Sequence, residues 1–255
     1  MRFVTQVLFL AGRLSHGASS LFHYSAASTL GLAELKEAIR HSWQDYNSRE
    51  ADIAAGLMLW EEDLIGRFVT PGATVLVIGC GSGRDLIPLA ERGCRVTGIE
   101  PASSALDIAR RVLREHQASA TLIEGFFEDV QLAGAFDVVM FSYYCYCYIP
   151  QSHRRIAMLR EAAAHLTTGG HILVSYPSLS RARPVIIWLA RAIGALCGSD
   201  WRLEPGDLVV RYGSFYNYAH AFRPEEIETE AAAAGLRVVY RRDFPDDPVA
   251  SLVVD

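Results

Sequence analysis

The sequence predicts an α/β fold built on a doubly wound, mostly parallel sheet of seven strands. Two observations support this prediction. Short apolar runs rich in β-branched residues, such as Thr74–Ile78 and Phe136–Phe141, are typical of buried parallel strands. Segments whose apolar residues recur at helical spacing separate these runs. Because strands and helices alternate in this way, we expect a parallel sheet with helices on both faces.

The predicted elements follow in a regular order. Apolar residues between Ser28 and Phe68 recur at helical spacing, so helices should precede the sheet. The strands are predicted over residues 74–78, 95–99, 120–123, 136–141, 171–176, 236–241 and 249–254, with helices over 85–92, 101–116, 154–166 and 224–235. The loop between the last two strands, with Pro245 and Pro248, is too short for a crossover helix. We therefore expect the last strand to run antiparallel.

The chain divides into two expected parts. Residues 1–69 form an N-terminal helical segment that caps the core, and residues 70–255 form the main domain. Within it, strand patterns stop at Tyr176 and resume at Leu236, so residues 178–222 are expected to be a mobile insertion that covers a substrate pocket and is not part of the sheet. Its apolar helix, residues 184–196, has basic residues around it. It could act as a lid or make peripheral contact with a membrane surface; a lid is favoured.

Composition and charge exclude several classes of protein. The chain has 255 residues, 51% of them hydrophobic, which is typical of a globular protein. A formal net charge of −5 argues against nucleic acid as a partner. The five cysteines form no disulfide or metal-ligand pattern, so we expect reduced thiols, a cytoplasmic location and no metal site. The apolar run Phe3–Ala11 is too short for a signal peptide or a membrane span, and an amphipathic helix is expected there.

A glycine-rich loop follows the first strand and gives the strongest functional signal. It contains Gly79, Cys80, Gly81 and Gly83 and precedes a helix, so its backbone can approach a ligand and offer free N–H groups. Glu100 ends the second strand, at the spacing where a carboxylate accepts hydrogen bonds from ribose hydroxyls. The pattern predicts a nucleoside-containing ligand; a tight turn with a surface carboxylate is the alternative.

Four segments resemble the class I S-adenosylmethionine-dependent methyltransferases: Val75–Gly83, Gly98–Pro101, Phe136–Val139 and Gly169–Val174. The resemblance implies a Rossmann-like methyltransferase fold, S-adenosylmethionine as cofactor, and methyl transfer to an N or O nucleophile of a small molecule or peptide. Two alternatives stay open. One is a non-catalytic nucleoside-binding or regulatory module that kept the fold. The other, a nicotinamide-dependent oxidoreductase, is disfavoured because Arg84 stands where a dinucleotide fold needs a small residue.

The resemblance also implies a cofactor site. In it, the glycine loop lines the methionine part, Glu100 holds the ribose, the Phe127 N–H and the Glu128 carboxylate face the adenine, and Arg84 pairs with the cofactor carboxylate. Tyr46 would close over the cofactor. A packing role for Tyr46 is equally expected. Solvated side chains that do not contact the cofactor are equally expected for Arg84 and Glu128. The implied cofactor residues are Tyr46, Gly79, Cys80, Gly81, Gly83, Arg84, Glu100, Pro101, Phe127, Glu128 and Phe141. One departure is Val77, since members of the family usually carry an acidic residue there.

The substrate side is expected beyond the carboxyl ends of the strands. The segment Ser142–Tyr148 is unusually aromatic, and Tyr143 and Tyr144 are candidates to face the acceptor or the cofactor's sulfonium, because aromatic faces attract cations. Packing beneath the insertion is the alternative for such rings. His220 is the candidate general base, with a hydrogen-bonded structural histidine as the alternative. Nothing in the sequence indicates the oligomeric state.

Overall fold

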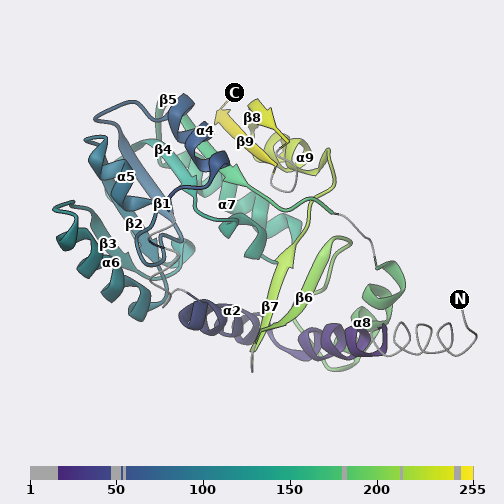
Figure 1. Cartoon of the computed structure of the whole chain (residues 1–255). Coiled ribbons are helices and arrows are strands. Elements are labelled where there is room, and N and C mark those ends of the chain that lie inside the picture. Colours follow the sequence, from purple (N-terminus) through teal and green to yellow (C-terminus); the bar gives the residue numbers. More distant parts are fainter. Residues whose placement is uncertain are drawn as a thin grey trace, which may run out of the picture.

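The computed structural model describes residues 17–46, 53, 56–179, 183–212, 215–243 and 248–254. Within these residues a seven-stranded sheet has the order β3-β2-β1-β4-β5-β9-β8 (Figure 1). Its strands are β1 (Thr74–Ile78), β2 (Arg95–Glu100), β3 (Thr121–Glu124), β4 (Phe136–Phe141), β5 (Leu166–Ser175), β8 (Leu236–Arg242) and β9 (Val249–Val254). β1 to β5 pair in parallel, whereas β9 is antiparallel to both neighbours. The predicted fold class and the reversed last strand are thereby confirmed.

Helices cover both faces of this sheet. Leu76 and Ile78 of β1 pack in one core with α7 (Ser152–Ala164) and α9 (Glu226–Ala233). Val75 and Val77 point to the opposite core, which contains α4 (Leu59–Phe68), α5 (Leu86–Glu91) and α6 (Ser103–Glu115). Successive side chains of a strand face opposite sides of a sheet. The apolar run of β1 is therefore continuous because both of its faces are buried.

A third, smaller core lies outside the sheet. It joins the helix over residues 17–29 and α2 (Leu32–Tyr46) to the insertion, which consists of α8 (Pro184–Leu196), β6 (Asp207–Tyr212) and β7 (Phe215–His220). Figure 1 shows these elements side by side along one edge of the molecule. At Gly194 a Cβ atom would lie 2.6 Å from the Ser28 carbonyl oxygen, so the glycine permits α8 to cross the first helix closely. We call this helix, α2 and the insertion the cap.

The described part of residues 178–222 lies outside the seven-stranded sheet, but it contains two strands that the sequence pattern did not indicate. β6 and β7 form a two-stranded antiparallel sheet in which Asp207 pairs with His220. A further bridge joins Ser178 to Phe222. The strand pattern was not recognised because polar residues, Asp207 and His220, occupy buried positions of these strands. α8 is found where the sequence predicts it, and its mobility stays a prediction.

The outer face of α8 carries exposed apolar side chains. Val185 and Trp188 are each 68% exposed and Leu196 is 89% exposed. None of the helices that the structure describes combines the length and the apolar character that a membrane crossing requires. The amphipathic helix expected over Phe3–Ala11 lies outside the described residues.

Candidate cofactor and acceptor site

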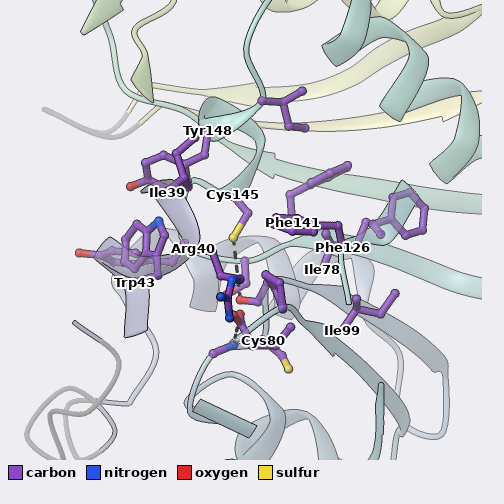
Figure 2. Close-up of a pocket in the computed structure, with 18 of the residues that line it drawn as sticks. Ile39, Arg40, Trp43, Ile78, Cys80, Ile99, Phe126, Phe141, Cys145 and Tyr148 are labelled. Atoms are coloured by element: carbon purple, nitrogen blue, oxygen red, sulfur yellow. Dashed lines mark hydrogen bonds between the residues drawn. The ribbon is translucent and has the colours of Figure 1, made fainter. Parts of the chain in front are cut away.

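A cavity of about 600 Å³ lies at the carboxyl ends of β1, β2 and β4. In a parallel sheet, connections that leave neighbouring strands in opposite directions open a crevice at this edge. Figure 2 shows Ile39, Arg40 and Trp43 of α2 on one side of the cavity and Phe126 and Phe141 on the other. The sheet side comprises Ile78–Ser82, Ile99–Pro101, Gly125–Glu128 and Phe141–Tyr143. Most of the expected cofactor residues therefore line one cavity.

The glycine loop forms the floor of this cavity. Gly79 has a φ of +74°, and a Cβ atom there would lie 2.1 Å from the Sγ of Cys145. The backbone N–H groups of Gly79 and Cys80 both donate to the Ile99 carbonyl, at 2.8 and 3.0 Å. The loop is thus tied to β2 and admits only glycine at its first position.

Gly83 does not line the cavity, contrary to expectation. A Cβ atom there would lie 3.2 Å from the Cβ and 3.3 Å from the Cα of Ala109, and its φ is +91°. This glycine therefore lets the loop pack against α6. Gly79, Cys80 and Gly81 line the cavity as expected.

Glu100 is a buried carboxylate at the end of β2, only 5% exposed. One of its oxygens accepts from the Ala102 N–H at 2.9 Å and the other from the Gly81 N–H at 3.1 Å. Burial raises the pKa of Glu100 to about 7, against the opposite influence of these two donors. Each carboxylate oxygen has a second lone pair, so Glu100 can still accept hydrogen bonds from ligand hydroxyls. Pro101 lines the cavity beside it.

The segment after β3 supplies another part of the wall. Phe126, Phe127 and Glu128 line the cavity, with Phe127 and Glu128 in the 3₁₀ helix Phe127–Asp129. Phe127 is buried in the sheet core, as is Phe141 at the end of β4. The Glu128 carboxylate forms an ion pair with the Lys36 ammonium of α2. Glu128 thus joins the sheet wall to the cap.

Arg84 lines the cavity but already has anionic partners. Its guanidinium bonds both carboxylate oxygens of buried Glu61 in α4 and lies 2.8 Å from an Asp85 oxygen. It also donates to the Gly56 carbonyl at 2.9 Å and lies over the Tyr143 ring, 5.3 Å from its centre. Its pairing with a cofactor carboxylate stays a prediction, in competition with these contacts.

The two tyrosine candidates are placed differently. Tyr143 lines the cavity, whereas Tyr144 does not. The Tyr144 ring packs 5.5 Å from that of Trp60, and its N–H donates to the Ser175 Oγ at 3.1 Å. Their φ angles are +37° and +63°, values that non-glycine residues seldom adopt. The turn therefore directs Tyr143 to the site, while Tyr144 packs in the core.

His220 is fully buried and does not line the cavity. Its Nδ1 lies 2.7 Å from an Asp207 oxygen, and its Nε2 lies 2.9 Å from a Glu226 oxygen. Burial lowers the pKa of His220, but the bonds to Asp207 and Glu226 more than offset this, so the pKa is raised. With both ring nitrogens engaged by carboxylates, His220 has no nitrogen free to take a proton from an acceptor. The structure therefore contradicts the expected general base.

The expectation that the insertion lines the pocket was also wrong. None of the described residues between 183 and 222 lies in the cavity wall. Instead α2 closes the cavity, and the insertion holds α2 in place through the third core. Tyr46 ends α2, and its side chain lies outside the described part of the chain.

Sequence reasoning missed the residues of this second wall. They are Lys36, Ile39, Arg40 and Trp43 on α2, and Arg154, Ala157, Met158 and Glu161 on α7. Helical spacing places each set on one face, but no local pattern indicates which cavity that face adjoins. Among the described residues, no group of three His, Cys, Asp or Glu side chains could hold a metal ion.

Comparisons with known proteins agree with this geometry. Residues 75–170 match the family model described as a methyltransferase domain. The cypemycin N-terminal methyltransferase of a Streptomyces species is 34% identical over 116 residues, 46% of this chain and 45% of that protein. The chain thus spans less than half the length of that relative. The ubiquinone biosynthesis O-methyltransferase of Xanthomonas axonopodis pv. citri is 27% identical over 228 residues, 88% of this chain and 85% of that protein.

A solved structure shows the same fold. It is the glycopeptide N-methyltransferase MtfA complexed with S-adenosylhomocysteine, which aligns with a TM-score of 0.57 and 18% identity over 76% of this chain and 88% of that one. The match over residues 75–170 identifies a segment similar to a methyltransferase domain, and the sheet order and the likeness to MtfA show that the chain shares the fold of that protein.

Proposed function

We propose that this chain is an S-adenosylmethionine-dependent methyltransferase that methylates an N or O nucleophile of a small molecule or peptide. One observation carries the proposal: the buried Glu100 carboxylate and the Gly79–Ser82 loop line the same cavity. The relatives support both kinds of nucleophile, since one is described as an N-terminal methyltransferase and the other as an O-methyltransferase.

The residues present fit the proposed cofactor. The glycine loop presents backbone without side chains, because a Cβ at Gly79 would meet Cys145. Glu100 retains acceptor capacity for two ribose hydroxyls, and Phe126 and Phe141 give the neighbouring wall an apolar surface suited to an aromatic base. These features support a nucleoside in this part of the cavity.

When bound, S-adenosylmethionine would supply an activated methyl group: the acceptor's N or O lone pair would bond to the methyl carbon as the C–S bond breaks, with S-adenosylhomocysteine as the leaving group. The chain's own contribution is to hold the two reactants in line and to exclude water, because positioning supplies most of the advantage in such a displacement. α2 closes the cavity opposite the glycine loop. The Tyr143 ring borders the cavity and can interact with positive charge through its face.

Binding of S-adenosylhomocysteine and of NAD to the purified protein tests the proposal. We expect calorimetry to detect the first and not the second. Glu100→Ala should weaken S-adenosylhomocysteine binding by about 1.5–3 kcal/mol, since hydrogen bonds to a charged acceptor are worth about that much.

Glu124→Ala is the matched control for this variant. Glu124 ends β3 directly beside Glu100, is exposed and does not line the cavity. We expect it to leave the affinity unchanged. Absence of S-adenosylhomocysteine binding by the wild-type protein would refute the proposed function, and binding without turnover of any acceptor would favour the non-catalytic module. Peripheral contact of α8 with a membrane surface and a cytoplasmic location stay predictions.

A further inference from the structure

Arg154 is a basic residue of the cavity wall whose charge no other part of the described chain compensates. It lies in the first turn of α7 and lines the cavity. Its Nε atom is buried and has no hydrogen-bond partner, and none of the ion pairs found among the described residues includes Arg154. A buried polar group without a partner is costly, so an unexplained one in a cavity wall points to a ligand.

The other basic residues of this wall all have carboxylate partners. Lys36 pairs with Glu128, Arg40 with Glu37, and Arg84 with Glu61. Next to Arg154 in the sequence, Arg155 points into the interior, where it bonds the Glu230 carboxylate at 2.7 Å. Within the described cavity wall, Arg154 therefore differs from its neighbours in having its positive charge available.

The position of Arg154 on α7 strengthens this contrast. The start of a helix carries the positive end of the helix dipole, which disfavours cations there and favours anions. Yet the first turn of α7 contains His153, Arg154 and Arg155 and no acidic residue. The helix itself therefore does not stabilise the Arg154 charge, whereas an anion bound there would gain from both the guanidinium and the dipole.

The cavity that Arg154 lines also has apolar and aromatic side chains in its wall. Trp43 of α2 and Tyr148 contact each other edge to face, with ring centres 4.9 Å apart. Ile149 and Met158 line the same cavity, and Tyr148 and Ile149 come a few residues before α7 in the chain. Such a wall suits a flat apolar group.

We propose that the methyl acceptor is an organic acid: an apolar, ring-containing molecule with an anionic group, carboxylate or phosphate, that the Arg154 guanidinium binds. This inference rests on the proposed function, because it assigns the acceptor's place in the same cavity. Arg154 is then a specificity-determining residue. It distinguishes charged acceptors from neutral ones by a forked, charge-assisted contact, which matches carboxylate and phosphate geometry.

The test compares matched probes on protein saturated with S-adenosylhomocysteine. The probes are 4-aminobenzoate, 4-aminophenyl phosphate and the uncharged 4-aminobenzamide. We expect at least one acid to bind about ten-fold more tightly than the amide, which corresponds to about 1.4 kcal/mol. Whichever acid binds more tightly relative to the amide identifies whether the site recognises a carboxylate or a phosphate.

Arg154→Gln should abolish this preference, whereas Arg160→Gln should retain it. Arg160 is an exposed arginine of the same helix that does not line the cavity. The affinity for S-adenosylhomocysteine should stay within about two-fold of wild type in both variants.

Three results would overturn the inference. The first is equal or undetectable binding of acids and amide by wild-type protein that binds S-adenosylhomocysteine. The second is an acid preference that survives in Arg154→Gln. The third is a loss of S-adenosylhomocysteine affinity in that variant, which would assign Arg154 to the cofactor instead. If the wild-type protein does not bind S-adenosylhomocysteine, the proposed function itself is refuted. This result is distinguishable from the three that refute only the acceptor class.

Discussion

The two walls of the cavity are built in different ways. On the sheet side, the loop Gly79–Ser82 and Glu100 are positioned by their own strands and by hydrogen bonds between adjacent backbones, such as those from Gly79 and Cys80 to Ile99. On the cap side, α2 reaches the cavity only because the insertion, more than 130 residues later in the sequence, packs beneath it. The sheet wall is thus positioned by its own strands and by hydrogen bonds between adjacent backbones. The cap wall is positioned by packing between segments that are far apart in the sequence.

Polar contacts connect the cap to the sheet domain. Arg155 of α7 bonds Glu230 of α9, which also accepts from the Tyr146 hydroxyl at 2.6 Å. From α9 the contacts continue through Glu226 to His220 of β7, and from there to Asp207 of β6. This buried network runs from the helices of the sheet to the strands of the cap. Because the two walls depend on different contacts, cofactor binding and attachment of the cap should respond to different substitutions.

The largest effect is expected from breaking this network. Arg155→Met leaves Glu230 buried without its cation, and removal of one partner from a buried ion pair costs about 3–5 kcal/mol. Chemical denaturation should show this loss in the free energy of unfolding. Arg160→Met, on the exposed side of the same helix, should cost less than about 1 kcal/mol. Equal stabilities of the two variants would show that the network does not hold the cap.

A local change should instead impair the sheet wall. In Gly79→Ala the new Cβ atom would meet Cys145, so the loop must move and S-adenosylhomocysteine should bind at least about ten-fold more weakly. Gly72→Ala is the control for backbone strain, because Gly72 has a similar φ of +81° but no atom within 4 Å of the new Cβ.

We expect Gly72→Ala to lower the free energy of unfolding by about 1–2 kcal/mol and to leave the affinity unchanged. Calorimetric titration of both variants with S-adenosylhomocysteine distinguishes the effect of the steric clash with Cys145 from the effect of backbone strain. If Gly79→Ala retained wild-type affinity, the loop would not be the part of the wall that contacts the cofactor.

The smallest effect concerns pH and His220. Because its pKa is higher in the folded than in the unfolded protein, His220 contributes stability below its unfolded pKa of about 6.5, and this contribution is lost as pH rises through the folded value. The free energy of unfolding of wild type relative to His220→Gln should therefore fall with rising pH, by at most about 1.4 kcal/mol per pH unit. A difference between wild type and His220→Gln that rises with pH would contradict the assignment.

The sequence predicted the sheet wall largely correctly, and the reasons are visible in particular residues. The run Thr74–Ile78 followed by Gly79 and Gly81 is a local pattern, because both the buried strand and the tight turn are set by neighbouring residues. The same local reasoning failed at Gly83, where the requirement for glycine comes from Ala109 on another helix. It also failed at Tyr144, which packs against Trp60 of α4 and does not line the cavity.

The sequence by itself determined the alternation of strands and helices, the glycine loop, Glu100 at its strand end and the reversed last strand. These features depend on side-chain period, turn chemistry and chain connectivity, which act over short distances along the chain. Only the tertiary structure decided that α2 closes the cavity, that His220 is enclosed by Asp207 and Glu226, and that Arg154 faces the cavity while Arg155 faces the interior. The physical reason is that burial and charge pairing join residues far apart in the sequence, so the free energy of each such group depends on neighbours that no local pattern specifies.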